Sequence, residues 1–165
     1  MPTRKHPDTL DPRFQNIRGW LLLVAVGVVL LPLHLAGTLA VDLLPAFSKE
    51  GWALLTTPGT TFYHPLNVPV LIFELVGNVL LLVGSVIIAV EFFRKRKRVP
   101  LMVVGLLLFA LLFYAGDYFA AHLLVAVASQ GESEPVLDLV IAAVVCALLV
   151  GYFLVSKRVK GTFVR

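Results

Sequence analysis

The chain has 165 residues, of which 59% are hydrophobic and only 15% are charged, and its mean hydropathy is +0.92. This composition excludes an ordinary soluble domain and indicates an integral membrane protein. The net charge of +4 does not indicate nucleic-acid binding, because the basic residues lie directly beside apolar segments, where they fix topology and meet anionic lipid headgroups.

Four apolar segments are long enough to cross about 30 Å of hydrocarbon at about 1.5 Å per residue. They run approximately over residues 20–41, 68–93, 101–128 and 136–155. Little of the chain is left for a separate soluble domain. We therefore expect an all-α fold with a single membrane domain over residues 1–165, built as a four-transmembrane-helix bundle. The first segment is expected to be a retained anchor, because it lacks an A-x-A-like cleavage site.

The distribution of Lys and Arg predicts the orientation of the bundle, since positive charge is kept on the cytoplasmic side. Thirteen of the 14 basic residues lie in the N-terminal tail, the 94–99 turn and the C-terminal tail, and the remaining one is Lys49. We therefore expect both termini and the turn to be cytoplasmic, with residues 42–67 and 129–135 on the outer side. The basic residues of the turn are Arg94, Lys95, Arg96, Lys97 and Arg98.

The first outer loop is long and unusually apolar for a connection. Ser48 is a plausible N-cap, so we expect one or two helical turns over 48–56 at the interface. The Pro, Gly and Thr residues of "TTPGTTFYHP" predict turns and extended chain. Trp52 and Tyr63 fit interfacial anchors; the alternative is that they form, with His64, a lid over the bundle.

Ionisable residues interrupt the apolar segments at a common depth. Counting about 1.5 Å per residue places His34 and Glu74 about 21 Å, and Asp117 about 24 Å, from the inner face. Asn78 follows Glu74 by one helical turn, and Tyr114 and Tyr118 flank Asp117. Since exposing a carboxylate to lipid costs roughly 2.5 to 3.5 kcal/mol, we expect these side chains to form an inward-facing polar layer.

Three interpretations of this layer stay open. Interhelical hydrogen bonds stabilise membrane bundles by about 0.6 to 2 kcal/mol each, so the layer could be structural alone. It could instead bind a ligand or protein partner, or handle protons or ions. We expect no metal, because the spacing of His and acidic residues matches no HExxH-like pattern.

The sequence offers no basis for an enzyme or a cofactor. The single cysteine, Cys146, excludes an intrachain disulfide or a CxxC redox pair and is interpreted as a small packing residue. No G-x-S-x-G elbow, Walker loop or Rossmann glycine pattern is present. In the C-terminal tail, we expect Val159, Phe163 and Val164 to lie against headgroups while the basic residues face phosphate.

Several short motifs, in this order along the chain, carry a resemblance. They are "IRGWLLLVAVGVVLLPLHL", "WALLTTPGTTFYHP", "FELVGN", "FFRKRKRVP" and "YFLVSKRVKGTFVR". Together they resemble the bacterial inner-membrane family catalogued as domain of unknown function 2569. The resemblance covers nearly the whole chain and implies a four-helix protein of the bacterial inner membrane without an established activity.

Two functions follow from these observations. The first is a non-enzymatic accessory or binding component that meets a membrane-protein partner, a second copy of the chain or lipid through the outer loop and the polar layer. The second is a small oligomeric proton-coupled transporter, although the two halves of the chain show no obvious inverted repeat. We expect anionic lipid headgroups at the cytoplasmic face to be partners in either case.

Overall fold

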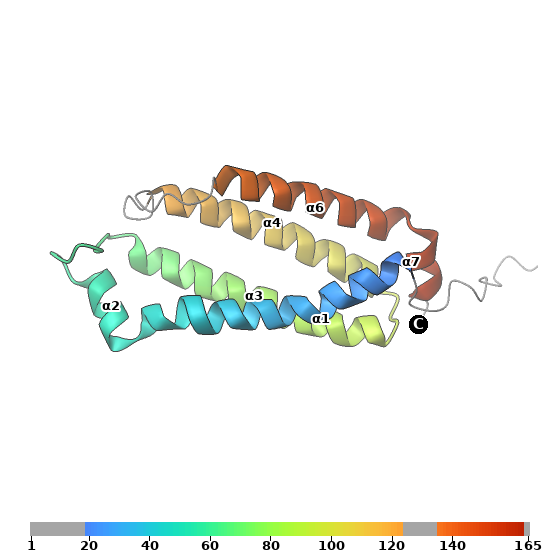
Figure 1. Ribbon diagram of the computed structural model, residues 1–165, viewed down its shortest axis with the longest axis horizontal. Helices are drawn as coiled ribbons and strands as arrows, with labels where there is room; N and C mark the ends of the chain where they lie inside the picture. The colour runs from blue at the N-terminus through green and yellow to red at the C-terminus, as the bar shows by residue number, and fades with distance from the viewer. Residues whose placement is uncertain (1–18, 124–134, 164–165) are drawn as a thin grey trace, which may run out of the picture.

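The computed structural model describes residues 19–123 and 135–163, and every element in this part of the chain is helical (Figure 1). Helix α1 (Trp20–Thr38) continues as a π-helical turn, η2 (Leu39–Leu43), and a 3₁₀ turn, η3 (Leu44–Phe47). The further helices are α2 (Lys49–Thr56), α3 (Asn67–Phe93), α4 (Val99–Leu123), α6 (Pro135–Val155) and α7 (Lys157–Thr162).

The long helices confirm the expected membrane bundle. Within residues 19–123 and 135–163, three segments are long and apolar enough to cross a membrane: Trp20–Phe47, Asn67–Phe93 and Val99–Ala120. A shorter apolar helical segment, Leu139–Val155, follows. The expected outer loop at 129–134 and the predicted end of the third segment near 128 lie outside the described residues.

Helices that follow one another along the chain pack side by side. Helix α3 contacts both α1 and α4, and α4 contacts α6 (Figure 1). The start of α1, the turn between α3 and α4, and α7 lie together at one end of the bundle, which we call the basic end. Helix α2 and the chain that follows it lie at the opposite end, which we call the loop end.

The larger hydrophobic core lies at the basic end, and the C-terminal tail closes it. Helix α6 stops at Ser156, whose hydroxyl accepts the Val159 N–H at 3.4 Å and so caps α7. Val159 is completely buried and Phe163 is 4% exposed, both in one cluster with residues of α1, α3, α4 and α6. The Phe163 ring meets that of Phe92 edge-on at 5.2 Å.

The expectation that Val159 and Phe163 lie against lipid headgroups is therefore wrong. Their spacing does give one apolar face, but the break at Ser156 turns that face toward the protein rather than the membrane. Val164 lies outside the described residues.

The basic turn between α3 and α4 is a Schellman motif. The Lys95 N–H donates to the Phe92 carbonyl at 3.0 Å and the Arg96 N–H to the Glu91 carbonyl at 3.2 Å. Lys95 takes the left-handed conformation with φ 54° that glycine ordinarily supplies at this position. The Glu91 carboxylate also meets Arg94 at 3.7 Å and Arg96 at 3.8 Å.

The first loop is tied down by hydrogen bonds. Ser48 caps α2 by accepting the Gly51 N–H at 3.0 Å. The buried amide of Asn67 donates to the carbonyls of Leu55 at 2.9 Å and Phe62 at 2.8 Å. Asn67 therefore holds the chain between α2 and α3 against the first turn of α3.

Candidate functional site

Two residues of α3, one turn apart, begin the site. Glu74 and Asn78 are both half-buried, and the Asn78 side-chain N–H donates to the Glu74 carbonyl at 2.9 Å. This bond fixes the Asn78 amide along the helix, so that its side-chain oxygen is left as an acceptor.

Helix α4 brings Asp117 opposite Glu74. The carboxyl groups of these two residues lie close enough to interact across the two helices. Two carboxylates at such short range repel each other, so a shared proton or a bound cation would stabilise the pair.

Reciprocal packing of aromatic rings on glycines sets this register. A Cβ at Gly77 would overlap the Phe113 ring, and a Cβ at Gly116 would lie 3.0 Å from the Phe73 ring. Each helix thus places a phenylalanine over a glycine of the other, and the two rings lie 5.1 Å apart. Small residues let helices approach closely in membranes, and here the approach leaves the neighbouring Glu74 and Asp117 facing each other.

The end of the first spanning segment completes a cavity of about 240 Å³. It contributes Thr38, Leu43 and Asp42, of which Asp42 lies in the π-helical turn η2. Turns of this kind are rare and occur frequently at functional sites. The remaining lining residues are Glu74, Asn78, Leu81, Phe113, Tyr114 and Asp117. We call this space the acidic cavity, because its lining, as far as the chain is described, holds three carboxyl groups and no Lys, Arg or His.

Four of the six predicted layer residues line the acidic cavity: Glu74, Asn78, Tyr114 and Asp117. Tyr118 is half-buried outside its lining, with its ring 5.5 Å from that of Phe119.

His34 does not belong to the acidic cavity. Its side chain is exposed, whereas the next residue, Leu35, is buried against Leu81 and Phe113. Adjacent residues of a helix point about 100° apart, so burial of Leu35 turns His34 outward. The prediction that His34 joins the polar layer is therefore wrong, because depth along a helix does not give the direction of a side chain.

Sequence reasoning missed Asp42, which supplies the polar group from this segment in place of His34. Asp42 was assigned to the outer loop because the apolar run ends at Val41. The helical conformation instead persists through η2 and η3 to Phe47. The apolar residues on both sides of Asp42 were the one sequence feature that indicated a helix continuing past Val41.

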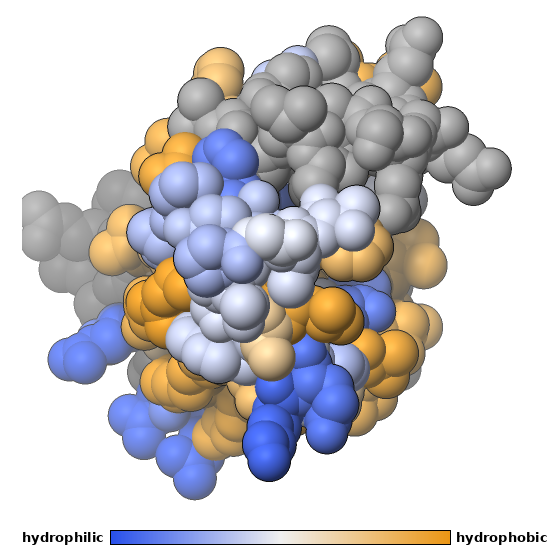
Figure 2. Space-filling model, turned by 90° about the vertical axis from the view of Figure 1, so that its left-hand side faces the viewer, coloured by the Kyte–Doolittle hydropathy of each residue, from blue (hydrophilic) through white to orange (hydrophobic). Residues whose placement is uncertain are grey.

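The proposed lid residues lie at the loop end but outside the cavity lining. Trp52 stacks on Phe47 with ring centroids 5.8 Å apart, and the His64 Nδ1 accepts the Leu66 N–H at 3.2 Å. Tyr63 is exposed. Figure 2 shows that this end presents a largely hydrophilic surface with hydrophobic surface around it. The lid remains a prediction.

Other groups in the described part of the chain serve packing. No cluster of three or more His, Cys, Asp or Glu residues suited to a metal ion occurs in residues 19–123 and 135–163. The buried Cys146 thiol lies 3.6 Å from the Leu107 carbonyl, linking α6 to α4.

The fold and the acidic cavity define a small helical membrane protein with a polar site between its apolar helices. The chain belongs to the family described as Protein of unknown function (DUF2569), whose model matches residues 14–164. The expected family is thus confirmed over nearly the whole chain. Neither the curated proteins nor the solved structures contain a match.

Proposed function

We propose that this protein is a non-enzymatic binding component of the bacterial inner membrane whose acidic cavity takes up a positively charged group from a ligand or partner. The observation that supports this is the meeting of Glu74, Asp117 and Asp42 around one cavity that is lined by no basic side chain. Glu74 and Asp117 are half-buried and Asp42 is exposed, and like charges gathered around one cavity repel each other unless a cation compensates them.

An ammonium group fits the chemistry of the lining. It carries three hydrogen-bond donors and no acceptor. The cavity offers carboxyl oxygens, the Asn78 amide oxygen, and the hydroxyls of Thr38 and Tyr114. A volume of about 240 Å³ suits a small group or the end of a side chain rather than a large ligand.

The proposal includes an orientation in which the basic end faces the cytoplasm. The turn at Arg94 to Arg98 and the basic residues of α7 lie at that end (Figure 1). The protein then crosses the membrane several times with both termini inside, and the acidic cavity opens in the outer half. A cationic group would reach it from the side of α2.

Binding of a simple ammonium probe tests the proposal. The full chain is purified in detergent, and its melting temperature is followed with increasing n-propylammonium or the uncharged 1-propanol. We expect only the ammonium ion to raise the melting temperature. Glu74→Gln combined with Asp117→Asn should weaken this response at least tenfold, because both changes keep the shape and remove the charge.

Glu91→Gln provides the matched control. It removes one carboxylate from the same helix as Glu74 but at the basic end, next to Arg94 and Arg96, and should leave the ammonium response unchanged. Equal responses to the ammonium ion and the alcohol, or an unaltered response in the cavity variant, would contradict the proposal.

A proton-coupled carrier is a second candidate, favoured by the neighbouring carboxyl groups of Glu74 and Asp117 in one cavity lining. Neighbouring carboxyl groups can share a proton, which an entering cation could displace. In proteoliposomes with a pH-sensitive dye inside, a carrier would change the internal pH when the ammonium ion is added outside. Loss of this change in Glu74→Gln, relative to protein-free liposomes, would favour the carrier, and an absence of coupling in the wild type would favour binding alone.

A further inference from the structure

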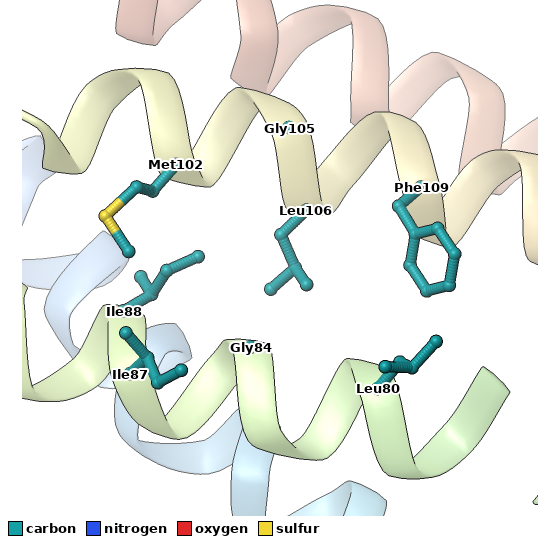
Figure 3. A pocket seen from close by; sticks show the side chains of 8 residues that line it. All are labelled: Leu80, Gly84, Ile87, Ile88, Met102, Gly105, Leu106 and Phe109. Carbon is teal, nitrogen blue, oxygen red and sulfur yellow. The ribbon is translucent and has the colours of Figure 1, made fainter. Parts of the chain in front are cut away.

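A second hollow lies between α3 and α4 and shares no lining residue with the acidic cavity (Figure 3). It has a volume of about 400 Å³, and side chains of both helices point into it. Ile88 is buried at its base, while Leu80, Ile87 and Phe109 are exposed along its sides. The hollow is therefore an apolar slot that opens to the surface of the bundle.

Two glycines shape the slot in different ways. A Cβ at Gly84 would lie 2.8 Å from a Leu106 methyl group, so Leu106 already fills the space above Gly84. A Cβ at Gly105 would meet nothing within 4 Å. Gly105 therefore lines the slot on α4 at a position where an added side chain meets open space.

The basic turn adjoins one end of this slot. Met102 and Ile88 are the lining residues nearest to it on each helix. They lie four residues from Arg98 and six residues from Arg94, which corresponds to roughly 6 and 9 Å along a helix. The turn holds five basic residues, and one carboxylate, that of Glu91, pairs with Arg94 and Arg96. Lys97 and Arg98 are exposed.

We propose that the slot binds one acyl chain of an anionic phospholipid whose phosphate is held by the basic turn. Apolar lining fits the chain, and the excess positive charge at its end fits the phosphate. Lys and Arg residues near a surface of anionic lipid attract its negative charge, so a turn with this many cations favours such a headgroup over a zwitterionic one.

The geometry disfavours a helix of a second copy as the occupant. Packed helices lie about 8 to 10 Å apart, whereas a helix with its side chains is about 10 to 12 Å wide. A helix can therefore lie over the gap between α3 and α4 but cannot enter it as an extended hydrocarbon chain can. A second copy in the same orientation would also place its basic turn beside this one, and like charges repel.

Native mass spectrometry of the full chain in detergent tests the site. Phosphatidylglycerol and phosphatidylcholine with identical acyl chains are added in equal amounts. We expect the wild type to retain one phosphatidylglycerol preferentially. Gly105→Leu should lower this retention at least fivefold, because it adds a bulky side chain to the lining where an acyl chain would lie. The matched control is Gly151→Leu, which adds the same side chain at another exposed glycine with open space around it.

Removing charge tests the headgroup independently of the slot. Lys97→Gln with Arg98→Gln should abolish the preference for phosphatidylglycerol. Lys157→Gln with Lys160→Gln, which removes two charges from α7 at the same end, should leave the preference intact. Equal retention of both lipids by the wild type, or full retention in Gly105→Leu, would overturn the proposal. So would a dimer that Gly105→Leu dissociates without loss of lipid.

Discussion

At the scale of single residues, Lys95 shows how a tight turn was built without glycine. Its backbone adopts φ 54° to close the Schellman motif after α3. For a residue with a Cβ, this conformation costs roughly 1 kcal/mol or more, and glycine avoids that cost. A basic residue here fits the charge of the turn, which the proposed lipid phosphate would use.

We expect Lys95→Gly to increase the free energy of unfolding by about 1 kcal/mol relative to Lys95→Ala. Both variants lose the ammonium group, so their difference isolates the backbone conformation. Unfolding in mixed micelles, followed by circular dichroism, measures it. Equal stability of the two variants would show that Lys95 does not hold the left-handed conformation.

At the scale of elements, the contact between α3 and α4 determines whether the acidic cavity forms. Phe113 lies against Gly77, and Phe73 lies against Gly116. The same rings are adjacent in space, with centroids 5.1 Å apart. Glu74 follows Phe73 in the sequence and Asp117 follows Gly116, so any shift between the two helices would separate the two carboxyl groups.

Gly77→Ala should destabilise the protein by about 1 to 3 kcal/mol, because the added methyl group overlaps the Phe113 ring and forces the helices apart. Gly105→Ala makes the same change in α4 where space is open, and should stabilise it by about 0.5 to 1 kcal/mol. The two free energies of unfolding should therefore change in opposite directions. A loss of stability of similar size in both would refute this account.

Helix α7 and the residue after it also contribute to stability, because they pack into the core at the basic end. Phe163→Ala should cost about 3 to 5 kcal/mol, since its ring is buried against Phe92. Phe93→Ala removes the same ring from a position that is 53% exposed and should cost much less. Thermal unfolding of both variants measures the difference, and a comparable loss in Phe93→Ala would exclude a special role for the tail.

At the scale of the whole molecule, the two ends of the bundle differ in chemistry. The basic end holds the larger core, the basic turn and α7, whereas the loop end holds α2 and adjoins the acidic cavity. We infer two separate sites from this polarity, one for a cationic group and one for an anionic lipid. They depend on different residues and can be tested separately.

The proposed orientation predicts which positions a membrane-impermeant maleimide reaches in spheroplasts. In a Cys146→Ala background, Thr61→Cys should be labelled in intact spheroplasts. Lys97→Cys should be labelled only after permeabilisation, because the basic end is retained inside. The opposite pattern would place the acidic cavity on the cytoplasmic side and remove the proposed route of entry.

The sequence by itself determined the class of protein, the approximate helices and the charged turn. These follow from length, apolar composition and charge, which depend on local properties of the chain. It also indicated Glu74, Asn78, Tyr114 and Asp117 as one polar layer, because position along a helix can be counted as depth.

Only the tertiary structure decided which side chains face inward. Depth along the helix does not predict the direction of the His34 and Asp42 side chains. The burial of Leu35 turns His34 outward, and the helical turn η2 places Asp42 at the cavity. The sequence of the tail likewise does not predict what its apolar face contacts, because Val159 and Phe163 could pack against lipid or protein equally well. The break at Ser156 lets this face pack into the core at the basic end of the bundle.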